Sequence, residues 1–412
     1  MFNLSSNFQG KSKDGQKEQQ WRLFHAKDFQ SLMYPCFTFC HILGIFPYKI
    51  DASTFKASKP HYILLTVITC VCVIYTLITL FGYSLRGEIS MIQVPWILVN
   101  SCNFVFGTFI IIVMFILSGP RMRLLQTIST LSSRLSSETY QKLSMLIHAK
   151  DIFGFLYLVG HAFLCVYILD LNLGFQLYLY LVVFQMDMLY MNCICVLKIC
   201  FKRINDNLVH MQELVTNNDP YDSRLIHQPR NLFLIMELRA MKKEHLMISE
   251  TVKMLNMIFS LHLLATLIIV FFDITVYLFY YEYIFHWPHN KMNTLEKILN
   301  GIYIFYCVVY NSTRTILIVW ACETGKDQAL QISTSIHDVF NNCTDKQIKN
   351  ELQIFSLQTL HCENIFSTKG LTVNAKLLTK IVGSIATYIL ILFQFMRMSY
   401  SCERMTNNIT KI

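Results

Sequence analysis

Long apolar runs alternate with more polar segments along the whole chain. Seven of these runs contain about 20 mostly apolar residues, the length that a helix needs to cross a roughly 30 Å hydrocarbon core. They are residues 62–83, 91–117, 152–169, 174–197, 254–281, 299–321 and 377–396. The pattern therefore predicts an all-α, polytopic membrane protein with seven transmembrane helices.

The composition supports a membrane protein. Hydrophobic residues make up 54% of the chain and charged residues only 15%, whereas soluble domains have about 45–50% and about 25%. The first residues are polar and contain no apolar core of a signal peptide, so we expect the N-terminus to remain in the cytosol. The 14 Cys residues lack the spacing of a disulfide framework or zinc site and are interpreted as small buried hydrophobic residues.

The segments between the predicted spans alternate between short and long. The short segments on one side are residues 84–90, 170–173 and 282–298, and the long segments on the other are residues 118–151, 198–253 and 322–376. The long segments, together with residues 1–61, carry 27 of the 35 Lys and Arg residues, and the opposite side carries 6. By the positive-inside rule the N-terminus is cytoplasmic and the C-terminus extracellular, the reverse of a G-protein-coupled receptor.

The long segments themselves have helical patterns. Residues 231–264 repeat apolar positions at helical spacing with charges between them, which predicts long cytoplasmic extensions of the membrane helices. These extensions either pack into a bundle or subunit interface, or remain solvated amphipathic helices. No internal repeat is visible, which argues against an inverted-repeat transporter.

Enzyme and cofactor motifs are missing from the sequence. It contains no GxGxxG, GxxxxGK[ST] or HExxH pattern and no GxSxG in a strand-turn-helix setting, so no enzyme activity, cofactor or metal is expected. No run of Lys and Arg indicates nucleic-acid binding. Of the four Asn-x-Ser/Thr sequons, at Asn3, Asn311, Asn342 and Asn408, only Asn408 falls on the predicted outer side, where it is a candidate glycosylation site.

Charged residues within the apolar runs are the first candidates for function, because a charge in hydrocarbon is costly and persists where it faces protein or water. They are Asp187, Asp273, Arg314 and Lys380. For Asp187, Asp273 and Arg314, the alternative to a functional role is structural ion pairing within the protein. Lys380 lies near the inner end of its span, where a long side chain can reach the interface.

Aromatic and amide residues in the outer halves or middles of spans two, four, five and six form the second group of candidates. An outward-facing cavity lined by such groups is typical of small-ligand sites, although Tyr and Trp near a membrane surface also serve as interfacial anchors. The ligand-binding candidates are Trp96, Asn100, Tyr178, Gln185, Asp273, Tyr277, Tyr303 and Tyr306.

The last span carries a recognisable motif. Thr387-Tyr388, five apolar residues and Gln394-Phe395 match the TYhhhhhQF pattern, and the chain resembles the insect gustatory receptors. The segment ENIFSTKGLTV resembles that family's F-x-A-x-G segment before the final helix, and LRAMKKEHL resembles its segment before span five. One departure is Thr368-Lys369, where the family has small or Cys residues before Gly370.

The resemblance implies a plasma-membrane tetramer in which the final helix of each subunit surrounds one cation pore and a pocket in each subunit binds a tastant. The pore and gate candidates are Thr387, Tyr388, Ile391, Gln394 and Phe395. An amide can face hydrated cations, and a ring of Phe side chains can close a pore by dewetting. The alternative is that Gln394 and Phe395 only pack between neighbouring helices.

The implied organisation has five regions. They are a cytoplasmic segment (1–61), six spans with a pocket in their outer half (62–321), a cytoplasmic segment with anchor helices (322–376), a pore-lining helix (377–396) and an extracellular tail (397–412). The tastant is a sugar, a bitter compound or another nutrient. Ile389 follows Tyr388 where the main sugar-receptor group has an acidic residue, which disfavours a sugar. The alternatives are an odorant-receptor-type channel subunit and a G-protein-coupled receptor.

Overall fold

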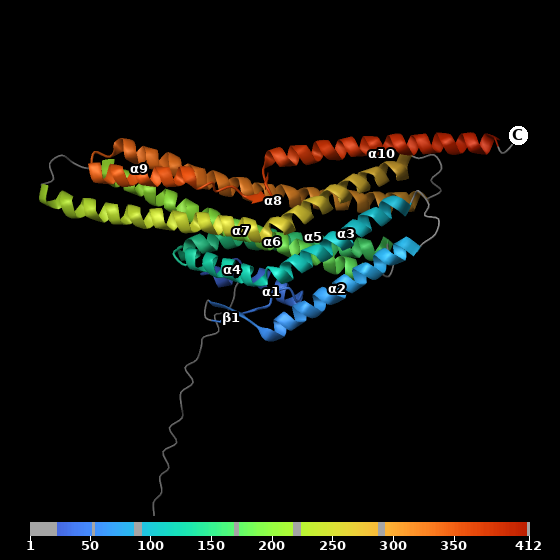
Figure 1. Ribbon diagram of the computed structural model, residues 1–412, viewed down its shortest axis with the longest axis horizontal. Helices are drawn as coiled ribbons and strands as arrows, with labels where there is room; N and C mark the ends of the chain where they lie inside the picture. Colours follow the sequence, from blue (N-terminus) through green and yellow to red (C-terminus); the bar gives the residue numbers. More distant parts are fainter. Residues whose placement is uncertain are drawn as a thin grey trace, which may run out of the picture.

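The computed structural model describes residues 23–51, 54–85, 93–168, 173–216, 224–286 and 293–409. Most of this part of the chain is helical (Figure 1). The helices are α1 (Phe29–Ile42), α2 (Lys59–Leu85), α3 (Gln93–Ile116), α4 (Ser118–Ser132), α5 (Ser137–Ile168), α6 (Leu173–Thr216), α7 (Arg224–His286), α8 (Thr294–Asn342), α9 (Lys346–His361) and α10 (Ala375–Ile409). The strands are β1 (Tyr48–Asp51), β2 (Thr54–Ala57), β3 (Ser367–Thr368) and β4 (Leu371–Thr372).

Seven helices in the described part of the chain are long and apolar enough to cross a membrane: α2, α3, α5, α6, α7, α8 and α10. Each corresponds to one predicted span, in the predicted order, although residues 91–92 and 169 lie outside the described residues. The predicted seven-helix, all-α fold is therefore confirmed. Two short antiparallel hairpins, β1–β2 and β3–β4, are additions that the sequence pattern did not predict.

Three helices extend well beyond the thickness of a bilayer. Helices α6, α7 and α8 contain 44, 63 and 49 residues. At 1.5 Å per residue, α7 is roughly 95 Å long, about three times the hydrocarbon thickness. Figure 1 shows these helices running together toward α9, and we call this end of the molecule the anchor end. The predicted long helical extensions are confirmed.

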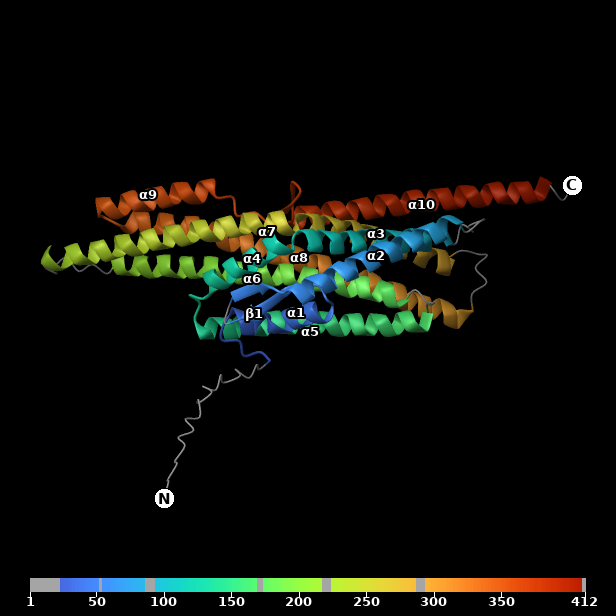
Figure 2. The ribbon, with the colours of Figure 1, turned by 60° about the horizontal axis from the view of Figure 1, so that its bottom comes forward.

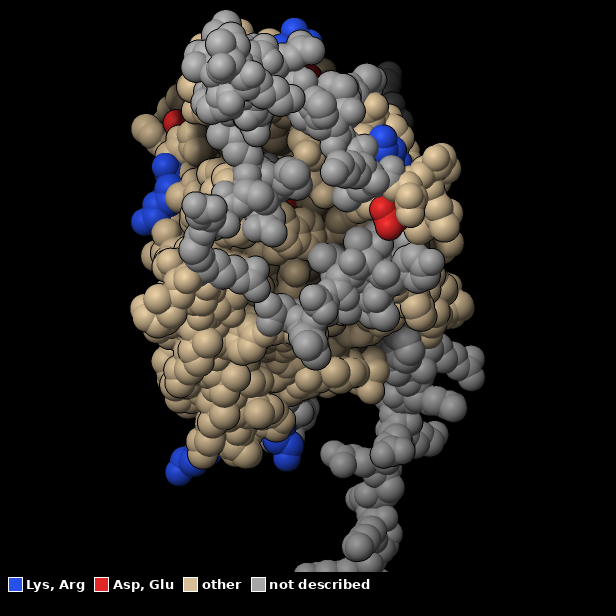
Figure 3. Space-filling view, turned by 90° about the vertical axis from the view of Figure 1, so that its right-hand side faces the viewer, with Lys and Arg blue, Asp and Glu red and all other residues tan. Residues whose placement is uncertain are grey.

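The opposite end, which we call the short-loop end, holds Leu85, Ile168 and His286 as the last residues of α2, α5 and α7. Figure 3 views this end directly and shows few charged side chains among the described residues. The scarcity of charge agrees with the small number of Lys and Arg residues in the short connecting segments.

Helix α6 is the centre of the core. In its apolar stretch of 18 residues, 94% is buried within the chain, whereas the corresponding shares for α2 and α10 are only 17% and 6%. Val182, Ile194 and Leu197 are completely buried along α6. A helix that is apolar and buried all round belongs inside a bundle, so α6 is the element around which the others pack. Figure 2 shows α10 and α5 at opposite edges of this bundle.

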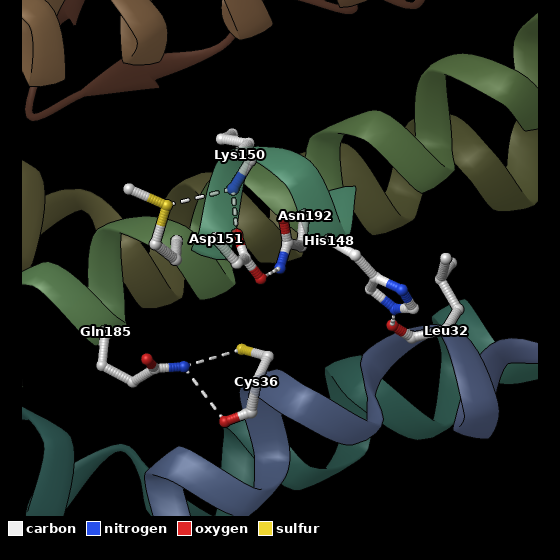
Figure 4. A network of polar contacts seen from close by, with 8 residues as sticks. Leu32, Cys36, His148, Lys150, Asp151, Gln185 and Asn192 are labelled. Atoms are coloured by element: carbon white, nitrogen blue, oxygen red, sulfur yellow. Dashed lines mark hydrogen bonds and ion pairs between the residues drawn. The ribbon is translucent and has the colours of Figure 1, made fainter. Parts of the chain in front are cut away.

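The N-terminal helix α1 is fastened to α5 and α6 by buried polar contacts (Figure 4). Asp28 caps α1 by accepting a hydrogen bond from the Ser31 amide at 2.8 Å. His148 Nε2 bonds the Leu32 carbonyl at 2.9 Å, and the Gln185 amide donates to the Cys36 carbonyl at 3.0 Å. The His148 and Gln185 contacts give polar atoms of two buried side chains a partner.

The hairpin β3–β4 fixes the start of α10 against α7. Asn256 on α7 donates to the Ile365 carbonyl at 2.7 Å and accepts from the Ser367 amide at 3.2 Å, so its side chain pairs with the backbone as a strand would. Lys369 and Gly370 form the turn with φ values of 43° and 84°. Two successive residues with positive φ are the geometry of a tight hairpin turn, which explains why Gly370 is needed there.

Candidate functional site

A cavity lies between α3, α6, α7 and α8 in the transmembrane part of the bundle. Its volume is only about 10 Å³, little more than a water molecule needs. Its lining residues are Asn103, Gln176, Leu179, Tyr180, Val183, Ile269 and Arg314. Gln176 lies only three residues from the first residue of α6, Leu173, so the cavity is displaced toward the short-loop end. An apolar wall with a few converging polar groups is the usual chemistry of a small-ligand site.

Arg314 is the charged group of this cavity, and it is paired with Asp187. Its Nε approaches the Asp187 carboxylate in an ion pair, and the exposed fractions of the two side chains are 2% and 0%. His262 Nε2 lies 3.3 Å from Asp187 Oδ1, and the Thr266 hydroxyl donates to the same oxygen at 3.3 Å. The pair joins α6 to α8, with α7 supplying His262 and Thr266. Two of the four charges singled out from the sequence, Asp187 and Arg314, are thus brought together.

Asp273 forms a second buried polar centre beside the cavity. Asn103 Nδ2 donates to Asp273 Oδ1 at 2.9 Å, and Asn311 Nδ2 lies 3.3 Å from Asp273 Oδ2. Asn100 accepts from Gln176 Nε2 at 3.2 Å, one helical turn from Asn103. Two of the predicted candidates, Asn100 and Asp273, therefore contact cavity-lining residues without lining the cavity themselves.

An aromatic cluster continues from Tyr180 toward α5 and α8. The His161 ring centroid lies 5.4 Å from that of Tyr180, 5.8 Å from that of Tyr303 and 6.2 Å from that of Tyr306. The Tyr277 and Tyr303 hydroxyls are 3.4 Å apart. Tyr277, Tyr303 and Tyr306 thus belong to one aromatic cluster beside Tyr180, and none of the three lines the cavity itself.

Trp96 packs against the apolar cluster that contains Tyr277 and Tyr303. The other two predicted ligand-binding residues lie elsewhere. The Tyr178 hydroxyl donates to the Leu43 carbonyl at 3.0 Å, just after α1. Gln185 also faces α1, through its contact with Cys36 (Figure 4). Both lie on α6 on its side toward α1 and outside the cavity lining.

Four cavity or cluster residues were missed by the sequence analysis: Asn103, Gln176, Tyr180 and His161. The signal for Asn103 and Gln176 is a neutral amide within an apolar run, at nearly the same depth as Asn100. Burying an amide costs free energy unless it finds a partner. Searching the runs for every amide, and not only for charges and aromatic rings, would have found both.

The final helix has two distinct faces. Ile381, Ile385 and Ile389 pack against Val270, Phe271 and Ile274 of α7. Thr387, Ile391, Gln394 and Phe395 are all exposed. A helical rotation of 100° per residue puts the first three on the side away from that stripe and Phe395 at the edge between the two faces. Tyr388 lies between the two faces, 53% exposed, with its ring against Phe271.

A bundle of seven helices of membrane-spanning length, with α2 and α10 left largely uncovered, is the architecture of a multi-pass membrane protein. Residues 33–398 match the family model described as 7tm Chemosensory receptor, and the chain belongs to this family. It is therefore a multi-pass membrane chemoreceptor, and the assignment suggested by the motif in α10 is confirmed.

Two groups of relatives agree with this assignment. Gustatory receptor 28b of Drosophila melanogaster is 27% identical over 158 residues, which are 37% of this chain and 32% of that relative. The matched stretch thus spans about a third of the relative's length. The structure of the insect olfactory receptor OR5 from Machilis hrabei has a TM-score of 0.61 and 12% identity, covering 89% of this chain and 98% of that chain. Its complex with eugenol has the same TM-score and 11% identity. These structures show a shared fold.

Proposed function

We propose that the chain is a gustatory receptor subunit that forms, with three identical or related subunits in the plasma membrane, a cation channel opened by a small-molecule tastant. The observation that carries this proposal is the exposed face of α10. The TYhhhhhQF resemblance implies that this helix lines a central pore, and its polar and aromatic motif residues are on the face that the subunit leaves uncovered.

The α10 face has the chemistry of a pore and gate. Gln394 presents a neutral amide that suits hydrated cations, and Phe395, which is 66% exposed, supplies an apolar ring beside it. Four such rings around an axis would close the pathway by dewetting, and a rotation of each helix about its own axis would turn Gln394 toward the pathway instead. Ile391, one turn earlier, would extend the closed apolar constriction.

The cavity between α3, α6, α7 and α8 is the proposed tastant site. Its volume of about 10 Å³ is far below the roughly 300–1,000 Å³ of most ligand pockets, so a tastant would enter it only as the surrounding helices move apart. The OR5 structure determined in complex with eugenol supports a small-molecule ligand for this fold. By the positive-inside rule, the short-loop end near the cavity faces outward.

Helix α7 connects the cavity to the pore helix. Ile269 lines the cavity, while Val270, Phe271 and Ile274 contact α10. A ligand that fits the cavity better when α7 has shifted stabilises that arrangement, and α10 follows because it packs mainly on α7. Such a ligand opens the channel only to the extent that it binds the open arrangement more tightly than the closed one.

The anchor end supplies the proposed contacts between subunits. Phe233 on α7 and Leu357 and Leu360 on α9 are 61%, 55% and 76% exposed. Large apolar side chains that remain exposed on the helical extensions are candidates for an association surface. Assembly through this surface would bring four α10 helices around one axis.

Whole-cell current from cells that express this chain alone tests the proposal. The cells are challenged with sugars, bitter alkaloids and amino acids, and wild type is compared with Gln394→Ala, Phe395→Ala and a control, Val382→Ala. Val382 is 59% exposed, and a rotation of 100° per residue places it well away from Gln394 and Phe395 around the helix. We expect an evoked cation current, leak in Phe395→Ala, altered permeation in Gln394→Ala and no change in the control. A response that disappears when G proteins are blocked would contradict the channel.

A further inference from the structure

Two histidine side chains meet where α1 ends and α2 begins. The His41 ring, in the last turn of α1, lies edge to face with the His61 ring, in the first turn of α2. Their centroids are 5.2 Å apart and their planes are at 65°. Both residues are partly exposed, so small solutes can reach them. Neither belongs to the candidate ligand site or to the pore helix.

The turn that follows α1 brings the two rings together. Gly44 has a φ of 70°, and its amide donates to the His41 carbonyl at 3.0 Å. The Ile45 amide donates to the Cys40 carbonyl at 3.0 Å, which completes a Schellman motif, the usual glycine-containing end of a helix. A Cβ at position 44 would overlap the side chain of Ile68 on α2, so glycine lets α1 end directly against α2.

The spacing of the two rings matches that of two histidine ligands on one metal ion. An imidazole nitrogen binds Zn²⁺ at about 2.0–2.1 Å, which puts the ion about 3.2 Å from the ring centroid, so two such rings at a tetrahedral angle have centroids about 5.2 Å apart. The centroids of His41 and His61 have this separation.

The surroundings favour the metal-binding form of both rings. Ser58 Oγ lies 2.7 Å from Nδ1 of His61, and when Nδ1 donates to this hydroxyl, Nε2 presents its lone pair to a metal. Burial, together with the neighbouring His61, lowers the pKa of His41 below its usual value near 6.5. The His41 ring is therefore neutral at pH 7, and a neutral imidazole is the form that binds metal.

We propose that His41 and His61 form a site for a divalent transition metal ion that favours imidazole ligands, such as Zn²⁺, and that this ion ties α1 to α2. Among the described residues, no third His, Cys, Asp or Glu side chain completes a cluster there, so water would fill the remaining coordination positions. By the positive-inside rule this junction faces the cytoplasm. The ion would hold α2, whose apolar stretch is only 17% buried, against the rest of the bundle.

Calorimetric titration of the purified full-length receptor with zinc chloride in detergent tests the site. Wild type is compared with His41→Gln, His61→Gln and a control, His337→Gln, which replaces an exposed histidine on α8. We expect each site variant to bind one Zn²⁺ fewer per chain than wild type, and the control to bind the same number as wild type. Mg²⁺ prefers oxygen ligands, so a titration with Mg²⁺ should not distinguish the four proteins.

Hydrogen exchange shows where the ion is bound. Zn²⁺ should slow amide exchange at the start of α2, in residues 59–66, in wild type and in His337→Gln but in neither site variant, because a metal that joins two helices suppresses local opening. Each site variant removes one of the two ligands, so either one is sufficient for the comparison. Equal numbers of Zn²⁺ bound by wild type and the site variants, or slowing at α2 that persists in them, would overturn the proposal.

Discussion

The ring of Phe271 on α7 meets the ring of Tyr388 on α10 edge to face, with centroids 5.5 Å apart and planes at 83°. Ile269, two residues before Phe271, lines the cavity. Helix α7 is thus in contact with the candidate ligand site on one face and with the candidate pore helix on another. Tyr388 belongs to the motif by which the chain resembles gustatory receptors, and this contact gives that residue a physical role.

The Phe271–Tyr388 contact should contribute to coupling between ligand binding and opening. Edge-to-face pairs contribute about 0.5–1.5 kcal/mol beyond area burial, so Phe271→Ala and Tyr388→Ala should each shift the half-maximal ligand concentration by roughly twofold to tenfold. The double variant should shift it by less than the sum of the two changes. Tyr388→Phe keeps the ring and should behave like wild type. Additive effects of the two Ala variants would show that the pair is not coupled.

The protein should lose more folding stability when one partner of the Asp187–Arg314 pair is replaced than when both are replaced. Asp187→Asn leaves a buried guanidinium without its counter-charge, which costs roughly 3–5 kcal/mol of folding stability. Arg314→Gln/Asp187→Asn removes both charges, so its unfolding temperature should lie closer to that of the wild type. The measurement is the unfolding temperature of the wild type and the two variants in detergent. The pair is not a structural unit if the single variant is as stable as the wild type.

The attachment of α9 to α7 should weaken in acid. Lys242 and Arg239 donate to Glu351 at 2.9 and 2.7 Å and hold the pKa of this carboxyl below its usual range near 4.5. Because the folded-state pKa is lowered, the stabilisation is present at neutral pH and is lost as the pH falls below 4.5 through the folded value. Glu351→Gln should therefore be less stable than wild type at pH 7, and this difference should shrink in acid. The measurement is the unfolding temperature of both proteins between pH 7 and pH 3.

Asn256 should hold the start of the pore helix in place. Asn256→Ala removes two hydrogen bonds to the segment before β3, each contributing about 0.5–1.5 kcal/mol. We expect a lower unfolding temperature together with increased current in the absence of ligand, because α10 begins directly after this hairpin. Asn342→Ala is the control, since that amide is exposed and bonds only within its own helix. If Asn256→Ala lowers the unfolding temperature but leaves the current without ligand unchanged, the hairpin has only a structural role.

The seven spans could be predicted because each is an apolar run long enough to cross a bilayer, and that signal is local. The hairpin β3–β4 could not, because two-residue strands are too short to show an alternating pattern. Its pairing with Asn256 depends on two segments more than 100 residues apart, as Asn256 and Ile365 are separated by 109 positions.

The candidate site was predictable to a similar extent. Arg314, Asp187 and Asp273 stood out because a charge inside an apolar run needs a partner, and they are brought to the cavity or beside it. Tyr178 and Gln185 have the same residue types as pocket-lining groups, yet they face α1. The periodicity of α6 alone cannot tell which of its polar positions faces α1, because that depends on where a separate amphipathic helix docks.

Channel activity is tested by reconstituting the purified chain alone in planar lipid bilayers and recording current with and without a compound that binds it. We expect a cation conductance that rises with ligand, and leak without ligand in Phe395→Ala. A purified wild-type protein that binds the compound but never conducts, while cells expressing it respond through G proteins, would contradict the channel proposal.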